Sequence, residues 1–221
     1  MRISAFIAIL LSHLCITAFS QQNNYWYFGR KAALNFSPPP GQQVPAIVLN
    51  SKMVADEATG AVSDAKGNLL FYTNGTTVYN KANQVMLNGD NLDGYISASQ
   101  LAIVPWPGND SLYYVFTTGA IETNFAEGYR YTVINTRLDN GNGQVISKNT
   151  VLNPSCTERI TTARHKNGTD IWVITNDNNS NIFQAWLVTC SGIQPAITSS
   201  VGVVLDQYPA FNSGVLKVSP N

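Results

Sequence analysis

Paired carboxylates could catalyse glycoside hydrolysis in this protein, and they are the catalytic groups that are hardest to recognise from a sequence pattern. A glycoside hydrolase needs two acidic side chains placed on either side of the scissile bond. Glu158 is the strongest candidate, because it opens a segment that we expect to form an innermost strand facing a central channel. No partner acid can be placed beside it, so we favour a solvated charge at a strand end and predict no catalytic residue. The remaining candidate acids are Asp56, Glu57, Glu122 and Glu127.

Residues for other kinds of catalytic site are scarce. After residue 20 the chain has one histidine, His165, and two cysteines, Cys156 and Cys190. His165 precedes a Lys-Asn-Gly turn, so we expect a surface residue at a strand end and not a general base. One histidine and two distant cysteines cannot supply the usual ligands of zinc.

Two loops could instead hold calcium. The segments 139–143 (DNGNG) and 177–181 (DNNSN) place side-chain oxygens at alternate positions, as calcium-binding loops do. Neither has the glycine at position six and the acid at position twelve of the helical calcium loop. Asn and Gly are also the residues that form hairpins, so we expect turns here and predict no metal or other cofactor.

The first 20 residues have the pattern of a cleaved export signal. Met1 and Arg2 give a basic start, residues 3–16 are mostly apolar, and small side chains at Ala18 and Ser20 precede Gln21. The alternative is an uncleaved membrane anchor, but the apolar run is shorter than the roughly 20 residues that span a bilayer. We therefore expect residues 21–221 to act outside the cytoplasm, with no insertion into a membrane after cleavage.

Charge excludes one class of partner. The whole chain has 13 Lys and Arg against 13 Asp and Glu, and charged residues make up only 12% of it. Binding to nucleic acid or to an anionic membrane needs clustered basic residues, which are absent here. A surface of uncharged Asn, Thr, Ser and Gly fits an extracellular β-protein.

The two cysteines of the exported chain could form a disulfide. Cys156 lies just before one expected strand, and Cys190 lies at the end of the strand two further along. In an antiparallel meander these positions are at opposite ends of the sheet, about 20 Å apart, which is too far for a bond. We therefore expect two free thiols.

Short β-rich segments recur along the chain, and apolar helical periodicity is missing. Many of these segments are apolar on both faces, which indicates strands sandwiched between stacked sheets. The clearest are Leu69–Thr73, Leu101–Val104, Tyr113–Thr117, Tyr129–Ile134, Ile171–Thr175 and Ile182–Val188.

Three of the segments share one design, in which a turn with Gly and Asn leads into an aromatic-rich strand that ends in Thr. The three are Lys66–Thr73, Gly108–Thr117 and Asn167–Thr175. A short strand precedes each turn, and further strands follow. A unit of about four strands that recurs about every 40 to 60 residues is typical of β-propeller blades.

We therefore predict an all-β partial β-propeller of three four-stranded antiparallel blades plus the first strand of another. The expected blades are 25–95, 96–153 and 154–202, with the next starting at 214–221, and residues 25–36 pair at an edge. Because one blade cannot bury both of its faces, we expect the chain to be the front of a longer propeller. A complete small β-sandwich is the alternative.

Six segments along the chain carry a resemblance to known proteins: Asn24–Gly29, Gly67–Gly75, Val78–Lys81, Gln100–Pro107, His165–Val173 and Gly214–Pro220. Together they resemble a module of secreted Bacteroidota proteins. The module is similar to the N-terminal propeller region of gliding-motility-associated proteins that a C-terminal domain sorts to the type IX secretion system. The resemblance implies further blades and a place outside the cell or on its outer surface, or in the periplasm if the sorting domain is lacking. It supplies no catalytic residues.

Residues 63–67 (SDAKG) also resemble the turn motif of sialidase propellers, although the spacing to its aromatic residue differs, and that motif is structural. Aromatic side chains fill the expected strands, where most should pack between blades. Together with Asn-rich loops they also suit carbohydrate. The favoured function is a non-enzymatic module for adhesion or for binding an extracellular glycan or protein, and the alternative is a propeller glycoside hydrolase.

Overall fold

The computed structural model describes residues 23–204 and 209–219. The expected export signal, residues 1–20, lies outside this range. The described residues form an all-β protein of several small antiparallel sheets, with three short helices: η1 (Ile121–Thr123), α1 (Leu138–Gly141) and η2 (Pro209–Asn212). No helix in this part of the chain is long and apolar enough to cross a membrane.

Four sheets follow one another in the order of the sequence. The first contains β1 (Tyr25–Phe28), β2 (Ala32–Asn35) and β3 (Ala46–Ile47). The second contains β4 (Gly60–Ser63), β5 (Leu69–Thr73) and β6 (Val78–Asn80). The third contains β7 (Ala102–Pro105), β8 (Leu112–Thr117), β9 (Tyr129–Asn135) and β10 (Gln144–Asn153). The fourth contains β11 (Ile160–Arg164), β12 (Ile171–Asn176), β13 (Ile182–Thr189), β14 (Gly192–Ile193) and β15 (Ile197–Ser200).

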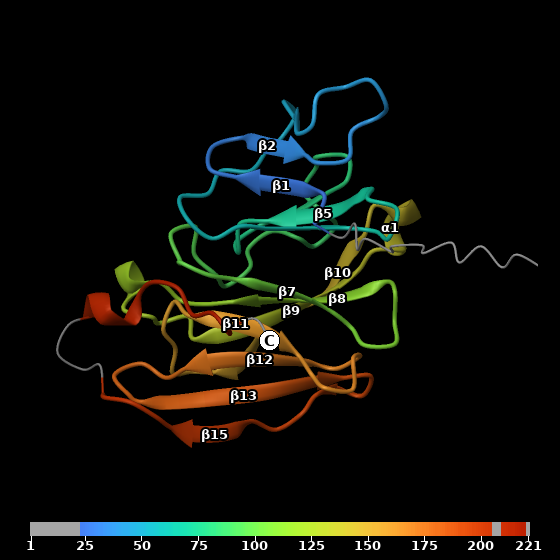
Figure 1. The fold of residues 1–221 in the computed structure, drawn as a ribbon. Coiled ribbons are helices and arrows are strands. Elements are labelled where there is room, and N and C mark those ends of the chain that lie inside the picture. Colours follow the sequence, from blue (N-terminus) through green and yellow to red (C-terminus); the bar gives the residue numbers. More distant parts are fainter. Residues whose placement is uncertain (1–22, 205–208, 220–221) are drawn as a thin grey trace, which may run out of the picture.

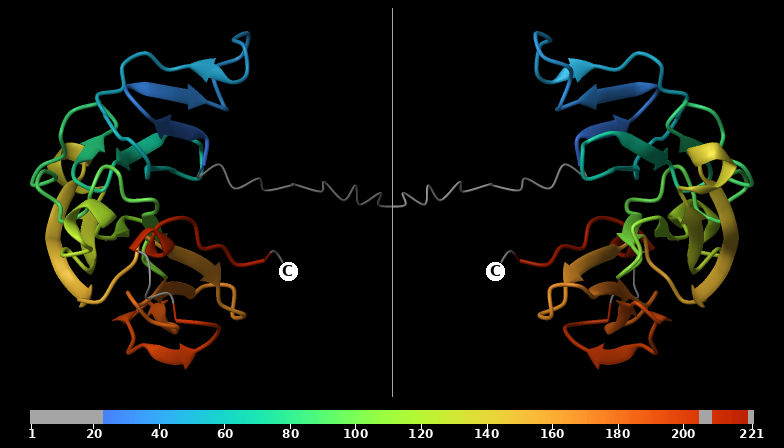
Figure 2. Two further views of the ribbon diagram at one scale, coloured as in Figure 1. Left: turned by 90° about the vertical axis from the view of Figure 1, so that its left-hand side faces the viewer. Right: turned by 90° about the vertical axis from the view of Figure 1, so that its right-hand side faces the viewer.

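The sheets are stacked as successive layers (Figure 1). Figure 2 shows that the layers follow an arc, with the C-terminal segment, residues 213–219, on its inner side. The first strands of the sheets lie next to one another, β1 against β4, β4 against β7, and β7 against β11. Each sheet therefore turns its first strand toward the same region of the molecule.

Apolar side chains on both faces of the strands explain the stacking, as the sequence predicts. In β8, Tyr113 and Val115 pack toward the second sheet, while Tyr114 and Phe116 pack toward the fourth. Alternate residues of a strand point to opposite faces, so an all-apolar strand is stable only between two other layers. Three hydrophobic cores result, one between each pair of neighbouring sheets.

The three repeated segments occupy the same place in their sheets. Each forms a hairpin turn and then the second strand, β5, β8 or β12. The turn glycines Gly67, Gly108 and Gly168 have φ of 85°, 77° and 78°. Only glycine adopts this backbone conformation readily, which accounts for the recurring Gly in the pattern. The predicted hairpins are confirmed.

Two expectations for the ends of the fold need correction. Residues 25–95 form two sheets and not one unit, because β1 makes a separate layer in which Tyr27 stacks on Tyr72 with ring centroids 3.7 Å apart. Residues 214–219 form no strand. A strand needs a backbone ladder, whereas Leu216 pairs with the side-chain amide of Gln100, at 2.7 Å from its N–H and 3.2 Å to its carbonyl oxygen.

Candidate functional site

The strongest candidate acid, Glu158, is buried and hydrogen-bonded. Its side chain is only 2% exposed, two residues before β11. One carboxylate oxygen accepts from the Ser99 hydroxyl at 2.5 Å and from the Ser99 N–H at 3.3 Å, and the other accepts from the Ile121 N–H at 2.8 Å. The interpretation as a solvated charge is therefore wrong, and the carboxylate faces protein donors and not an open channel.

Residues around this carboxylate form what we call the Glu158 junction: Ser99, Gln100, Ile121, Glu158 and Asn212. The Glu158 N–H donates to the Asn212 carbonyl at 2.9 Å. The Gln100 amide oxygen accepts from the Ile160 N–H at 3.2 Å as well as from Leu216. The junction thus joins the segment before β7, the loop after β8, the start of β11 and the segment after η2.

Three of the other candidate acids, Asp56, Glu122 and Glu127, have side-chain partners. Glu127 accepts from the Thr123 hydroxyl at 2.5 Å, and Glu122 accepts from the Ser97 hydroxyl at 2.7 Å. Asp56 forms an exposed ion pair with Arg30 at 3.1 Å, and the Asp56 and Glu57 N–H groups donate to the same carbonyl. The structure gathers the acids in the loops at one end of the sheets but, within residues 23–204 and 209–219, groups no three acids, histidines or cysteines as metal ligands.

Two titratable groups lie next to the Glu158 junction in the core between the third and fourth sheets. Burial raises the pKa of the Cys156 thiol to about 12, and the nearby carboxylates add to the rise. Burial also raises the pKa of Tyr129, whose hydroxyl contacts the Arg159 carbonyl at 2.8 Å and the Thr157 hydroxyl at 2.9 Å. Cys156 and Cys190 are both free thiols, as expected.

His165 and the two candidate calcium loops, 139–143 and 177–181, lie in turns. The His165 Nδ1 atom accepts from the Asn167 N–H at 3.3 Å, which confirms a residue at the end of a strand. Asp139 and Asn140 adopt positive φ in the turn after β9. The Asp177 carboxylate accepts from the side-chain amides of Asn153 at 2.7 Å and Gln184 at 2.8 Å, so nearby amides already use one of its oxygens.

A groove of about 660 Å³ lies at the opposite end of the sheets, where the turns of the second and third sheets face each other. In Figure 1 this end is marked by α1, whose Gly141 lines the groove. We call it the hairpin groove. Its charged and aromatic residues are Asp64, Lys66, Lys81, Asp110, Tyr113 and Arg137. Its other lining residues besides Gly141 are Ala65, Asn68, Leu70, Pro105, Asn109 and Thr136.

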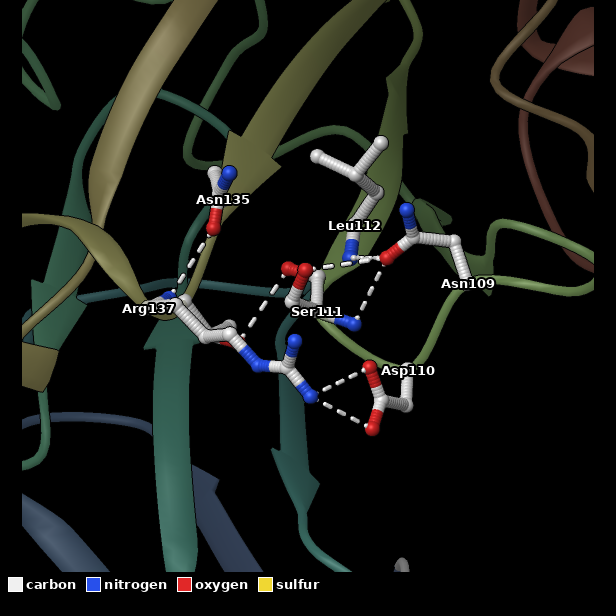
Figure 3. Close-up of polar contacts among 7 residues, drawn as sticks. Asn109, Asp110, Ser111, Leu112, Asn135 and Arg137 are labelled. Atoms are coloured by element: carbon white, nitrogen blue, oxygen red, sulfur yellow. Dashed lines mark hydrogen bonds and ion pairs between the residues drawn. The ribbon is translucent and has the colours of Figure 1, made fainter.

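Turn hydrogen bonds hold the wall that the third sheet supplies (Figure 3). The Asn109 side-chain oxygen accepts from the Ser111 N–H and hydroxyl, both at 2.9 Å. The next residue, Asp110, is thereby directed toward Arg137, whose Nη2 atom donates to both carboxylate oxygens at 2.8 and 2.7 Å. This ion pair is largely exposed to solvent.

Asp64 supports the facing wall from the turn after β4. Its carboxylate accepts from the Lys66 N–H at 2.8 Å and from the Asn68 N–H and side-chain amide, both at 2.9 Å. Burial opposes ionisation, but the hydrogen bonds from Asn68 and Lys66 prevail and lower the pKa of this carboxyl. Asp64 thus stays charged while its oxygens hold the turn.

The lysines of the groove differ from its aspartates. Lys66 and Lys81 are exposed, and neither forms an ion pair within the described part of the chain. Tyr113 lies between the two walls, and burial, followed by the charges of Asp110 and Asp64, raises the pKa of its hydroxyl. The groove therefore offers available cations beside aspartates that are already engaged.

Sequence reasoning missed the hairpin groove, although it located the turns that form it. The signal was present in two Gly/Asn turns of consecutive units with charged residues beside each glycine. Equivalent turns of stacked sheets must lie at the same end, so their charges face each other. Comparisons with protein-family models, curated proteins and solved structures gave no match for the chain.

Proposed function

We propose that the protein is an exported, non-enzymatic binding module, in which the sheets are consecutive blades of a β-propeller and the hairpin groove receives an extracellular glycan or protein. The observation that carries this proposal is the groove itself. It is concave, and hydrogen-bonded turns of two neighbouring sheets hold its walls. Polar groups fixed on a rigid scaffold around a cavity of this size are typical of ligand sites.

The arrangement of the sheets supports the propeller. Successive antiparallel sheets along an arc, each with its first strand innermost, match the way in which blades surround an axis. Both ends of the stack expose apolar side chains, Trp26 and Ile47 on the first sheet and Ile197 on the last. The remaining blades of a longer chain would cover these surfaces, in line with the resemblance to gliding-motility-associated proteins of the cell surface.

The hydrogen bonds of the candidate acids favour binding over hydrolysis. A hydrolase acid must reach a glycosidic oxygen, and its partner must reach water or the sugar carbon. Glu158 instead accepts three hydrogen bonds from Ser99 and Ile121 in a buried position. Glu158, the strongest candidate acid of the glycoside hydrolase alternative, is thus already engaged by donors of the protein itself.

A glycan panel with two tryptophan variants tests the proposed function. Ala65→Trp places a bulky side chain in the hairpin groove, and Thr169→Trp places the same side chain in the exposed turn after β11, outside the groove. We expect retention of a ligand without release of sugars, at least tenfold weaker for Ala65→Trp and unchanged for Thr169→Trp. Release of reducing sugars, or equal binding by both variants, would overturn the proposal.

A further inference from the structure

The charges of the hairpin groove narrow the chemistry of its ligand. Asp64 is engaged by three N–H donors, and Asp110 is engaged by Arg137. Lys66 and Lys81 have no carboxylate partner in the described residues, although Lys66 contributes to the field around Asp64. The charge left over in the groove is therefore positive, and it favours a ligand that carries carboxylates.

Donors for such a ligand come from both walls. Arg137 uses only its Nη2 atom for Asp110 among the described contacts, which leaves the Nε and Nη1 donors of the guanidinium. Lys66 is in the turn of the second sheet, and Lys81 follows β6 with its Nζ atom near Gly141 of α1. A guanidinium and two ammonium groups can hold separate carboxylates along the groove.

The walls also suit the neutral part of a sugar. Leu70 and Pro105 provide apolar surface for the C–H face of a ring, and Asn68 and Thr136 provide polar groups for hydroxyls. The two engaged aspartates retain lone pairs that can accept from sugar hydroxyls, since a carboxylate has about four acceptor positions. A peptide offers one backbone N–H per residue, whereas each sugar ring offers several hydroxyls, so these carboxylates favour a glycan over a peptide.

We propose that the hairpin groove binds a uronic-acid polysaccharide, with Lys66, Lys81 and Arg137 receiving its carboxylates. This inference rests on the proposed binding function and specifies its ligand. A nucleic acid fits poorly, because Asp64 and Asp110 interrupt the basic surface that a continuous phosphate backbone requires. A polymer with one carboxylate per sugar and hydroxyls between them offers partners to both the cations and the aspartates that line the groove.

The test compares polygalacturonate with its fully methyl-esterified form, which keeps the sugar and removes the charge. We expect the protein to bind polygalacturonate in affinity electrophoresis and calorimetry, with affinity falling as salt increases. Binding to the ester should be at least tenfold weaker. Equal binding to the two forms would overturn the inference.

Charge-reversal variants locate the binding. Lys66→Glu and Lys81→Glu should each weaken binding to polygalacturonate at least tenfold. Lys166→Glu is the matched control, because Lys166 is exposed in the equivalent turn of the fourth sheet. This variant should bind polygalacturonate as tightly as the wild type does. Thermal unfolding of all three variants checks that each one folds.

The possible outcomes separate this inference from the proposed function. Suppose that a neutral glycan binds and that Ala65→Trp abolishes this binding. The proposed binding function would then stand, and the inference of a uronic-acid ligand would be overturned. Preference for poly-glutamate over polygalacturonate would show a peptide ligand and overturn it too. Failure of every glycan and protein probe to bind would contradict both.

Discussion

The Glu158 junction and the hairpin groove lie at opposite ends of the same stack of sheets. The charged side chain of the junction is buried, whereas most charged side chains of the groove are exposed. At the junction a single carboxylate is buried and surrounded by donors from distant segments. At the groove several charged side chains stay exposed, and the aspartates bond within their own turns or to an exposed arginine. One end of the repeat therefore stabilises the packing of sheets, while the other leaves charged groups exposed, where we propose that a ligand binds.

The lengths of the connections account for this difference. The β8–β9 connection at the junction end spans residues 118–128 and contains η1, so it is long enough to reach the neighbouring sheet. At the groove end the turns after β4 and β7 are tight hairpins that close on themselves. Tight turns cannot cover one another, so a cavity remains between them. The long β8–β9 connection therefore reaches across to the fourth sheet, and the two short turns leave the groove open between them.

Removing the buried carboxylate should give the largest effect. Glu158→Ala leaves the Ser99 hydroxyl and the Ile121 N–H without their acceptor inside the protein. We expect a loss of about 3 kcal/mol in the free energy of unfolding, measured by urea denaturation. Asp110→Ala at the groove is the control and should change stability by less than about 0.5 kcal/mol. Equal losses for both variants would remove the distinction between the two ends.

The buried Tyr129 hydroxyl, in the core beside the junction, should also contribute more to stability than an exposed polar group does. Tyr129→Phe removes contacts to Thr157, Arg159 and Asn176, and the buried Thr157 and Asn176 N–H groups lose an acceptor. We expect a loss of about 2 kcal/mol. Tyr131→Phe, in the same strand, should cost less than half as much, because Tyr131 is only half-buried. A larger loss for Tyr131→Phe would contradict this account.

Alkaline pH should weaken the core at the junction through Cys156. Burial raises the pKa of this thiol from the ordinary value of 9.0 to about 12, so above pH 9 the unfolded chain loses the proton while the folded chain keeps it. Stability that is fully present below pH 9 is then lost as pH rises toward 12, by about 1 kcal/mol per pH unit. Denaturation at pH 8 and 10 should show a smaller drop for Cys156→Ala than for wild type, and equal drops would contradict the assignment.

Removing the exposed ion pair of the groove should have the smallest effect on stability. Arg137 and Asp110 are both mostly exposed. We expect Arg137→Ala to change the free energy of unfolding by less than about 0.5 kcal/mol, because water screens such pairs. Differential scanning calorimetry would detect a larger loss, which would mean that the ion pair stabilises the fold and is not only an exposed contact of the groove.

Much of the fold could be predicted from local sequence patterns. Strands such as Leu69–Thr73 and the hairpins at Gly67, Gly108 and Gly168 follow from apolar runs and from the backbone freedom of glycine. The extra sheet within residues 25–95 could not be predicted, because it depends on Tyr27 stacking on Tyr72 across layers.

The environments of the charged residues were also beyond prediction. Glu158 and Ser99 are 59 residues apart in the sequence, and nothing near Glu158 reports its donor. The groove required the relative placement of two turns, which follows only from the stacking of their sheets. Local patterns therefore predict elements and turns, whereas burial and facing charges depend on contacts that are distant in sequence.

The side-chain amide of Gln100 should affect the rate of hydrogen exchange at Leu216. Its oxygen accepts from both the Ile160 and the Leu216 N–H groups, so the amide proton of Leu216 is held by a residue of the segment that leads into the third sheet, beside the start of the fourth. Hydrogen–deuterium exchange at Leu216 should therefore be slow only while these two sheets are docked. The exchange rate of this one amide, in an otherwise irregular segment, therefore reports how often the two sheets separate.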